Sequence, residues 1–220
     1  MDLNYTHVYL MPGMAANSSI FEYIQLPPNK FEIHLLEWIP PIDNETLSSY
    51  AQRMSLKITH DNSVLIGVSF GGVLVQEMSL FREIKKIIII SSIKSKSELP
   101  KKMYVARRLK LYKFLPTQLV AHFNKLSAFN FGQMVKKRLA LYQKYLSIND
   151  KRYLDWAIFN MVCWDRNETL PNIVHIHGNK DTVFPIQNIS NCIVVEGGTH
   201  IMILNKYKWL NKHLPQLIMS

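Results

Sequence analysis

Short apolar runs alternate with longer amphipathic stretches over the first part of the chain. Four runs have the length and apolar character of buried strands, and they lie at residues 6–11, 32–38, 64–68 and 85–92. Helical patterns fill the intervals, at about 46–59 and from the third run to about Arg82, where Leu74, Met78 and Phe81 form an apolar stripe. This alternation predicts an α/β fold with a mostly parallel sheet and helices on both faces.

The strand pattern stops near residue 94 and resumes near residue 171. Between them, three apolar stripes at helical spacing are formed by Val105, Leu109 and Tyr112; by Val135, Leu139, Tyr142 and Leu146; and by Leu154, Ile158 and Met161. Pro116 separates the first stripe from the second, and Asn149-Asp150 can cap the third helix. We therefore expect residues 94–170 to form an inserted helical cap.

Two more strands are expected after the cap, at 173–177 and 192–195, followed by an amphipathic helix at about 206–214. Together with the first four, they make a sheet of about six strands. The predicted core domain therefore comprises residues 1–93 and 171–220, interrupted by the cap.

Composition limits the class of protein. With 220 residues, 48% of them hydrophobic, the chain can bury the core of one large α/β domain. No apolar run approaches the roughly 18–20 residues of a membrane span, and the first residues lack signal-peptide features. We therefore expect a cytoplasmic protein without stable membrane insertion. Cys163 and Cys192 are too few for a disulfide framework, so both are expected to be reduced thiols.

The formal net charge of +10 raises the question of anionic partners. Positive charge is concentrated in the predicted cap, at Lys101, Lys102, Arg107, Arg108, Lys110, Lys113, Lys136, Lys137 and Arg138. No nucleic-acid-binding motif accompanies these residues, so no nucleic-acid partner is expected. A solvated helical face is the simpler interpretation. The alternative is a basic rim that attracts an anionic substrate.

Residues with catalytic chemistry follow four of the predicted strands. Pro12-Gly13-Met14 follows the first, Ser69 the third, Asp181 the fifth and His200 the sixth. Because ligands bind at the carboxyl edge of an open parallel sheet, these loops are expected to meet at one site.

Ser69 lies in a Gly-x-Ser-x-Gly pattern between a predicted strand and a predicted helix. A Cβ at Gly67 or Gly71 would collide where the two backbones pass close together. The serine backbone would be strained, and its hydroxyl would project above the sheet edge.

This strand–turn–helix motif resembles the nucleophile elbow of the α/β-hydrolase family. The order Ser, Asp, His along the chain is also that of the family, and the segments 177–185 and 197–200 resemble its acid and histidine loops. The resemblance covers nearly the whole chain. One departure is Pro12-Gly13, where relatives usually carry His-Gly; another is the absence of the usual antiparallel leading strands.

The resemblance implies a catalytic triad of Ser69 as nucleophile, His200 as base and Asp181 as the acid that orients the histidine. For the acid, Asp155 or Asp165 of the cap remains an alternative. The implied oxyanion hole consists of the backbone N–H groups of Phe70 and Met14, with Ala15 as the alternative to Met14.

The expected function is that of a serine hydrolase acting on a small to medium carboxylic ester or thioester through an acyl-enzyme intermediate. The expected partner is a small-molecule acyl substrate, anionic if the basic cap takes part in binding. The alternative is a catalytically idle protein that binds a small apolar ligand under the cap. No cofactor and no metal are expected, and His175 and His177, which alternate along a strand, are interpreted as structural.

Overall fold

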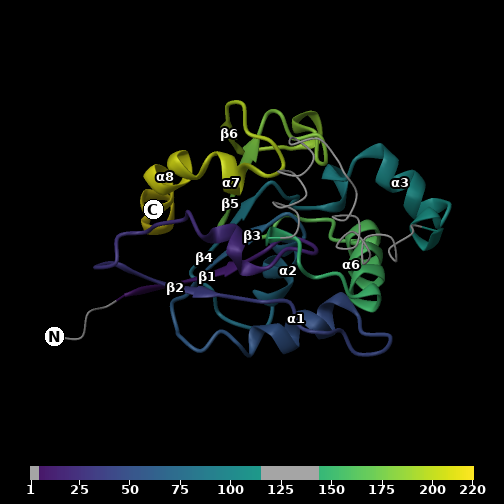
Figure 1. Ribbon diagram of the computed structural model, residues 1–220, viewed down its shortest axis with the longest axis horizontal. Coiled ribbons are helices and arrows are strands. Elements are labelled where there is room, and N and C mark those ends of the chain that lie inside the picture. Colours follow the sequence, from purple (N-terminus) through teal and green to yellow (C-terminus); the bar gives the residue numbers. More distant parts are fainter. Residues whose placement is uncertain (1–4, 115–143) are drawn as a thin grey trace, which may run out of the picture.

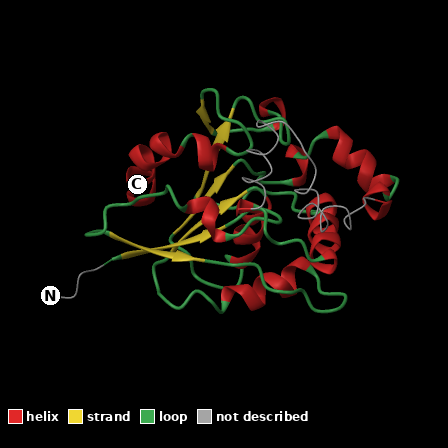
Figure 2. Cartoon of the chain, in the orientation of Figure 1, coloured by secondary structure: helices red, strands yellow, loops and turns green. Residues whose placement is uncertain are grey.

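The computed structural model describes residues 5–114 and 144–220. Within these residues, six strands form one sheet in the order β2-β1-β3-β4-β5-β6, and every pairing is parallel. The strands are β1 (Thr6–Met11), β2 (Phe31–Leu35), β3 (Val64–Val68), β4 (Lys86–Ile90), β5 (Ile173–Gly178) and β6 (Ile193–Val195). Figures 1 and 2 show the sheet at the centre with helices around it. The expected α/β fold with about six strands is confirmed.

Two apolar layers cover the two faces of the sheet. On one face, α1 (Leu47–Ser55), α2 (Phe70–Met78) and α6 (Lys151–Cys163) contribute buried residues to a common core. On the other face lie α7 (Met202–Asn205) and α8 (Tyr207–Met219), together with the short 3-10 helix η1 (Ser18–Phe21). Since β3 and the last four residues of β4 are buried on both faces, their sequences are continuously apolar.

Strand positions agree with the sequence expectation to within a few residues, but three helix ends differ. Helix α1 ends at Ser55, short of the expected residue 59. The elbow helix α2 ends at Met78, short of the expected Arg82. The last helix does not stop at Leu214 and continues through Pro215 to Met219. Leu210, Leu214 and Ile218 are all buried against the sheet. Packing of this stripe outweighs the backbone hydrogen bond that proline removes.

The predicted cap is described in part. It contains η2 (Lys96–Glu98), α3 (Lys101–Arg108), η3 (Leu111–Phe114) and α6. Asp150 caps α6 as expected, because its side chain accepts a hydrogen bond from the N–H of Tyr153 at 2.8 Å. The stripe residues Leu154 and Met161 are buried, in agreement with the pattern.

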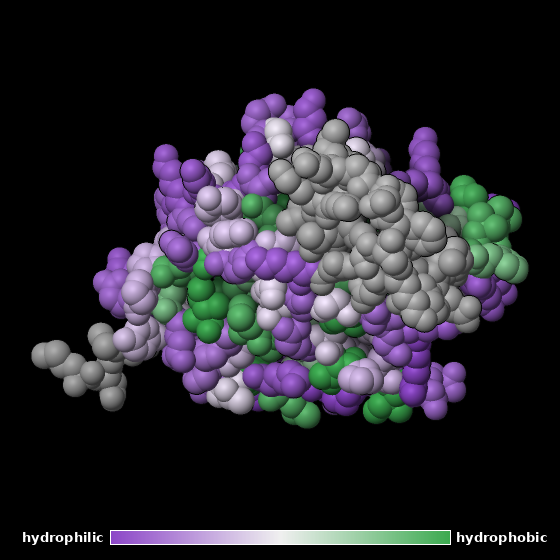
Figure 3. All heavy atoms as spheres, viewed as in Figure 1, coloured by the Kyte–Doolittle hydropathy of each residue, from purple (hydrophilic) through white to green (hydrophobic). Residues whose placement is uncertain are grey.

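Other expectations for the cap differ from the structure or lie outside the described residues. Val105 and Leu109 are 50% and 60% exposed, so the first stripe is not a core stripe. Apolar side chains are visible at the surface over the end of α3 and η3 (Figure 3). Three further predictions lie outside the described residues. They concern Pro116, the second stripe up to Tyr142 and the basic residues 136–138. Of the helices described, none has both the length and the apolar character that crossing a bilayer demands.

Candidate active site

Ser69 lies at the turn between β3 and α2, in the backbone conformation that the motif predicts. Its φ and ψ are 53° and −122°, a region that costs a non-glycine residue about 1–3 kcal/mol. A Cβ on Gly67 would lie 2.3 Å from the carbonyl oxygen of Gly71, and one on Gly71 would lie 2.3 Å from that of Pro12. The two glycines therefore let strand, helix and the loop after β1 pack in direct backbone contact around the serine.

The structure brings Ser69, His200 and Asp181 into one chain of hydrogen bonds. His200 Nε2 lies 2.9 Å from Ser69 Oγ, and His200 Nδ1 lies 2.9 Å from Asp181 Oδ2. Because an ionised carboxylate only accepts hydrogen bonds, Nδ1 carries the ring proton and donates a hydrogen bond to Asp181. In the neutral ring, Nε2 is then free to accept the hydroxyl proton of Ser69.

The two alternative acids from the cap are engaged elsewhere. Asp165 forms ion pairs with Lys96 and Arg107 at 3.0 and 3.1 Å, and Asp155 is paired with Lys151. Asp181 is therefore the carboxylate that contacts His200.

The Asp181 carboxylate is buried and held by three hydrogen-bond donors. Its Oδ1 accepts hydrogen bonds from the N–H groups of Val183 and Phe184, at 2.8 and 2.9 Å. Burial by itself would raise the pKa of this carboxyl group, but the hydrogen bond and the charge of His200, together with the two backbone donors, lower it below its usual value. Asp181 therefore stays ionised and fixes the tautomer of His200.

Two buried histidines of β5, His175 and His177, support the acid loop through hydrogen bonds. His177 Nε2 donates to the carbonyl oxygen of Phe184 at 2.8 Å, so its Nδ1 accepts from Nε2 of His175 at 3.1 Å. Burial, the neighbouring His177 and Lys94 lower the pKa of His175 to about 2. Burial also lowers the pKa of His177. Both rings are therefore neutral at ordinary pH, and the Phe184 ring in turn packs edge-on against His200 at 5.5 Å.

The loop after β1 lies directly against the elbow. An ideal Cβ on Gly13 would be 3.3 Å from Ser69 Cβ, and Ala15 has a positive φ of 62°. The Phe70 N–H belongs to the first turn of α2, where backbone donors lack a helical partner. Phe70 directly follows the serine, and Met14 directly follows the glycine that packs against it. Their role as oxyanion donors stays a prediction.

Trp38 is a residue of this site that sequence reasoning missed. Its indole N–H donates to the carbonyl oxygen of Gly13 at 2.9 Å, and its ring stacks on Phe70 at 5.2 Å with an interplanar angle of 8°. It therefore joins the two segments that carry the proposed oxyanion donors. Its only sequence signal was its place at the end of an expected strand, before Pro40-Pro41.

Solved structures share the fold of this chain over nearly their full length. An esterase from Exiguobacterium antarcticum matches with a TM-score of 0.66 at 16% identity, over 98% of this chain and 92% of its own. A bromoperoxidase from Bacillus anthracis matches with a TM-score of 0.65 at 15% identity, over 99% and 93%. An enol-lactonase from Burkholderia xenovorans LB400 matches with a TM-score of 0.67 at 14% identity, over 99% and 92%.

The chain has the α/β-hydrolase fold. The resemblance in its motifs thus extends to its three-dimensional structure. No protein-family model matches the sequence, and no curated protein matches it either. Because an esterase, a bromoperoxidase and an enol-lactonase match this fold almost equally well, the choice among reactions must come from the site itself.

Proposed function

We propose that this protein is a serine hydrolase that cleaves a small to medium carboxylic ester or thioester through an acyl-enzyme intermediate. The observation that carries the proposal is the hydrogen-bonded chain Asp181–His200–Ser69, with 2.9 Å at both contacts. A serine hydroxyl is a weak nucleophile unless a neutral imidazole removes its proton as it attacks. The site supplies such an imidazole together with the buried carboxylate that orients it.

The proposed reaction has two halves. Ser69 Oγ attacks the acyl carbon while His200 Nε2 takes its proton, and His200 then protonates the departing alcohol or thiol. In the second half, His200 removes a proton from water, which attacks the acyl-enzyme. Ser69 leaves, regains its proton from His200, and a carboxylic acid is released.

Negative charge develops on the substrate oxygen in both halves. We assign its stabilisation to the backbone N–H groups of Phe70 and Met14, held in place by the Trp38 contacts. Loss of one such donor typically costs about 10²–10³ in rate. The esterase with a similar fold supports an ester as the first substrate class to test.

The basic residues on α3 suggest the charge of the substrate's leaving group. Lys101, Lys102 and Arg108 are exposed, whereas Arg107 is paired with Asp165. We extend the proposal to a substrate whose leaving portion is anionic, which exposed cations at the rim would attract. A panel of acyl donors that differ only in the charge of the leaving group tests this extension.

Covalent labelling by a fluorophosphonate tests the mechanism first. Intact mass should show one label per parent chain and none on Ser69→Ala or His200→Ala, because both the nucleophile and its base are required. Ser48→Ala, which alters an exposed serine of α1, is the matched control and should label like the parent chain. Circular dichroism shows that each variant is folded.

Two results would contradict the proposal. A folded parent chain that takes up no label has a hydroxyl that is not activated, which favours the ligand-binding alternative. Labelling that survives in Ser69→Ala means that another residue is the nucleophile. When labelling is seen, turnover of the acyl panel identifies the substrate class.

A further inference from the structure

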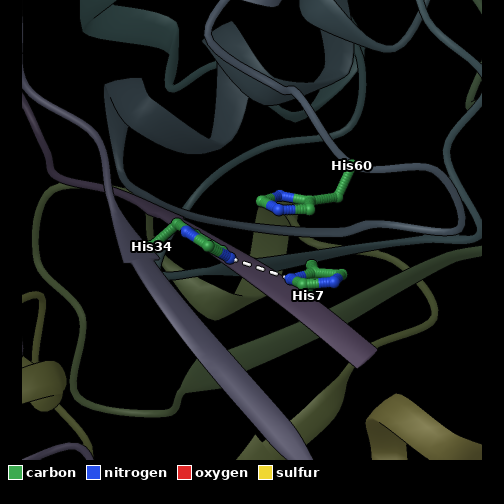
Figure 4. A group of neighbouring side chains, drawn as sticks. All are labelled: His7, His34 and His60. Carbon is green, nitrogen blue, oxygen red and sulfur yellow. Dashed lines mark hydrogen bonds between the residues drawn. The ribbon is translucent and has the colours of Figure 1, made fainter. Parts of the chain in front are cut away.

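Three histidines meet on one face of the sheet near its β2 edge. His7 belongs to β1, His34 to β2, and His60 to the connection between α1 and β3 (Figure 4). In the register of the two strands, His7 pairs with Glu32 and Tyr9 pairs with His34. Because alternate residues of a strand share a face, these four side chains project from the same side.

The three imidazoles are close enough to share one ligand. One nitrogen from each ring lies within 4.8 Å of one nitrogen of the other two. His7 Nδ1 and His34 Nε2 are 3.0 Å apart, and the rings of His7 and His60 stack at 3.7 Å. Tetrahedral Zn²⁺ with Zn–N bonds of about 2.0–2.1 Å requires its nitrogen ligands to be about 3.3 Å from one another. Because the His7 and His60 rings are stacked with an interplanar angle of 9°, these two rings must tilt for all three nitrogens to point at one ion.

An anionic side chain lies next to the three histidines. Glu32 places its two carboxylate oxygens 3.4 Å from His7 Nδ1 and 3.9 Å from His34 Nε2. Metal sites with imidazole ligands often include a carboxylate ligand as well. It would reduce the net charge of a bound dication in a partly buried position.

A hydrogen bond behind the cluster orients the third ring. The Tyr9 hydroxyl lies 2.7 Å from His60 Nδ1 and accepts the N–H of Thr59 at 3.1 Å. Since Nδ1 of His60 is engaged by Tyr9, Nε2 is the nitrogen left for a ligand. Metal-binding histidines commonly use their second nitrogen in this way, which sets tautomer and ring orientation.

The cluster is open to solvent. The side chains of His7 and His34 are 19% and 22% exposed, so an ion can reach them from solvent.

We propose that His7, His34 and His60 form a binding site for one divalent transition-metal ion, with Zn²⁺ as the best fit and Glu32 as the fourth ligand. The site is structural, because His7 and Met11 are separated by about 13 Å of strand and the active-site loop begins only after Met11. A bound ion would join β1, β2 and the α1–β3 connection. Because 27 residues separate His7 from His34, no local spacing in the sequence indicates the site.

Calorimetric titration of the full chain, treated with a chelator and then dialysed, with Zn²⁺ alone tests the proposal. We expect one ion per chain, and a loss of affinity of at least about tenfold in each of His7→Ala, His34→Ala and His60→Ala. The matched control is His213→Ala, since His213 lies on α8 and contacts Trp209. Co²⁺ in place of Zn²⁺ should give the visible absorption of a tetrahedral site in the parent chain and lose it in the three variants.

Thermal unfolding separates loss of the site from loss of the fold. Zn²⁺ should raise the Tm of the parent chain and of His213→Ala, and leave that of folded His34→Gln unchanged. Failure of the parent chain to bind Zn²⁺ at micromolar concentration would overturn the proposal. So would binding that all three alanine variants retain. Fluorophosphonate labelling of Ser69 is expected to be the same with and without Zn²⁺. The metal-site proposal and the serine-hydrolase proposal are therefore tested independently.

Discussion

At the scale of single residues, Asp181 carries out two tasks with its two oxygens. One oxygen accepts the N–H groups of Val183 and Phe184, and the other accepts the Nδ1–H of His200. The first task holds the acid loop in shape, and the second determines which nitrogen of His200 faces Ser69. An amide of the same size could keep the first task while failing in the second.

Asp181→Asn should therefore slow fluorophosphonate labelling of Ser69 by about 10³–10⁴, the size of effect known for a triad whose histidine adopts the wrong tautomer. The asparagine NH₂ donates to Nδ1, so Nε2 carries the proton and no longer accepts that of Ser69. Labelling rates from intact mass measure the effect. Asp165→Asn, which alters the cap carboxylate paired with Lys96 and Arg107, should label at the parent rate. Equal rates in both variants would show that Asp181 is not the orienting acid.

At the scale of elements, the position of His200 depends on close backbone contact between two loops. A Cβ on Gly178, the last residue of β5, would lie 2.2 Å from the carbonyl oxygen of Gly198. The same carbonyl accepts a hydrogen bond from the N–H of Lys180 at 2.8 Å. The histidine loop is thus held directly on the end of the strand that precedes the acid loop.

Gly178→Ala should displace residues 198–200 and lengthen the contact between His200 and Ser69. We expect at least a tenfold slower labelling rate and a lower Tm, since a 1 Å displacement can cost about 10² in rate. Lys180→Ala is the control, because its exposed side chain lies in the same loop and its loss creates no overlap. A Gly178→Ala chain that labels like the parent would mean that the loop can shift without moving His200.

At the scale of the whole molecule, buried neutral histidines couple stability to pH. The pKa of His175 is about 2 in the folded chain, against about 6.5 for an unfolded histidine. Between these values the unfolded state binds more protons, so the free energy of unfolding falls as pH falls below about 6.5. The lowered pKa of Asp181 acts in the same direction, but only below about pH 4.

Between pH 6 and pH 4.5, His175 should therefore contribute a loss of roughly 1.4 kcal/mol in unfolding free energy per pH unit. His175→Gln removes this contribution while its amide can still donate to His177, so its stability should fall less steeply with acid. Urea unfolding at several pH values measures both slopes. Parallel slopes for the two chains would show that His175 is not the group responsible, whatever the absolute stability of the variant.

Much of the fold and three residues of the candidate site were predictable because their signals are local. An apolar run such as 64–68 indicates a buried strand by itself, and Ser69 follows directly from the strand–turn–helix motif that the backbone angles now show. Gly67 and Gly71 were correctly expected at backbone contacts. The order of the strands brings Ser69, Asp181 and His200 to one edge of a parallel sheet.

Less predictable features depend on partners far away in the chain. Helix α8 passes through Pro215 because its buried stripe packs on the sheet, and Val105 and Leu109 are exposed although they fall at helical spacing. Trp38 and Gly13 are 25 residues apart in the sequence, and no sequence motif indicates that they are in contact.

The sequence by itself determined the α/β architecture, the approximate strands and the candidate nucleophile and base, since periodicity and short motifs act over a few neighbouring residues. Only the tertiary structure decided which carboxylate meets His200, which tryptophan supports the loop after β1, and that His7, His34 and His60 converge. The physical reason is the same in each case. Strand pairing and loop packing bring together side chains whose separation along the chain carries no local signal.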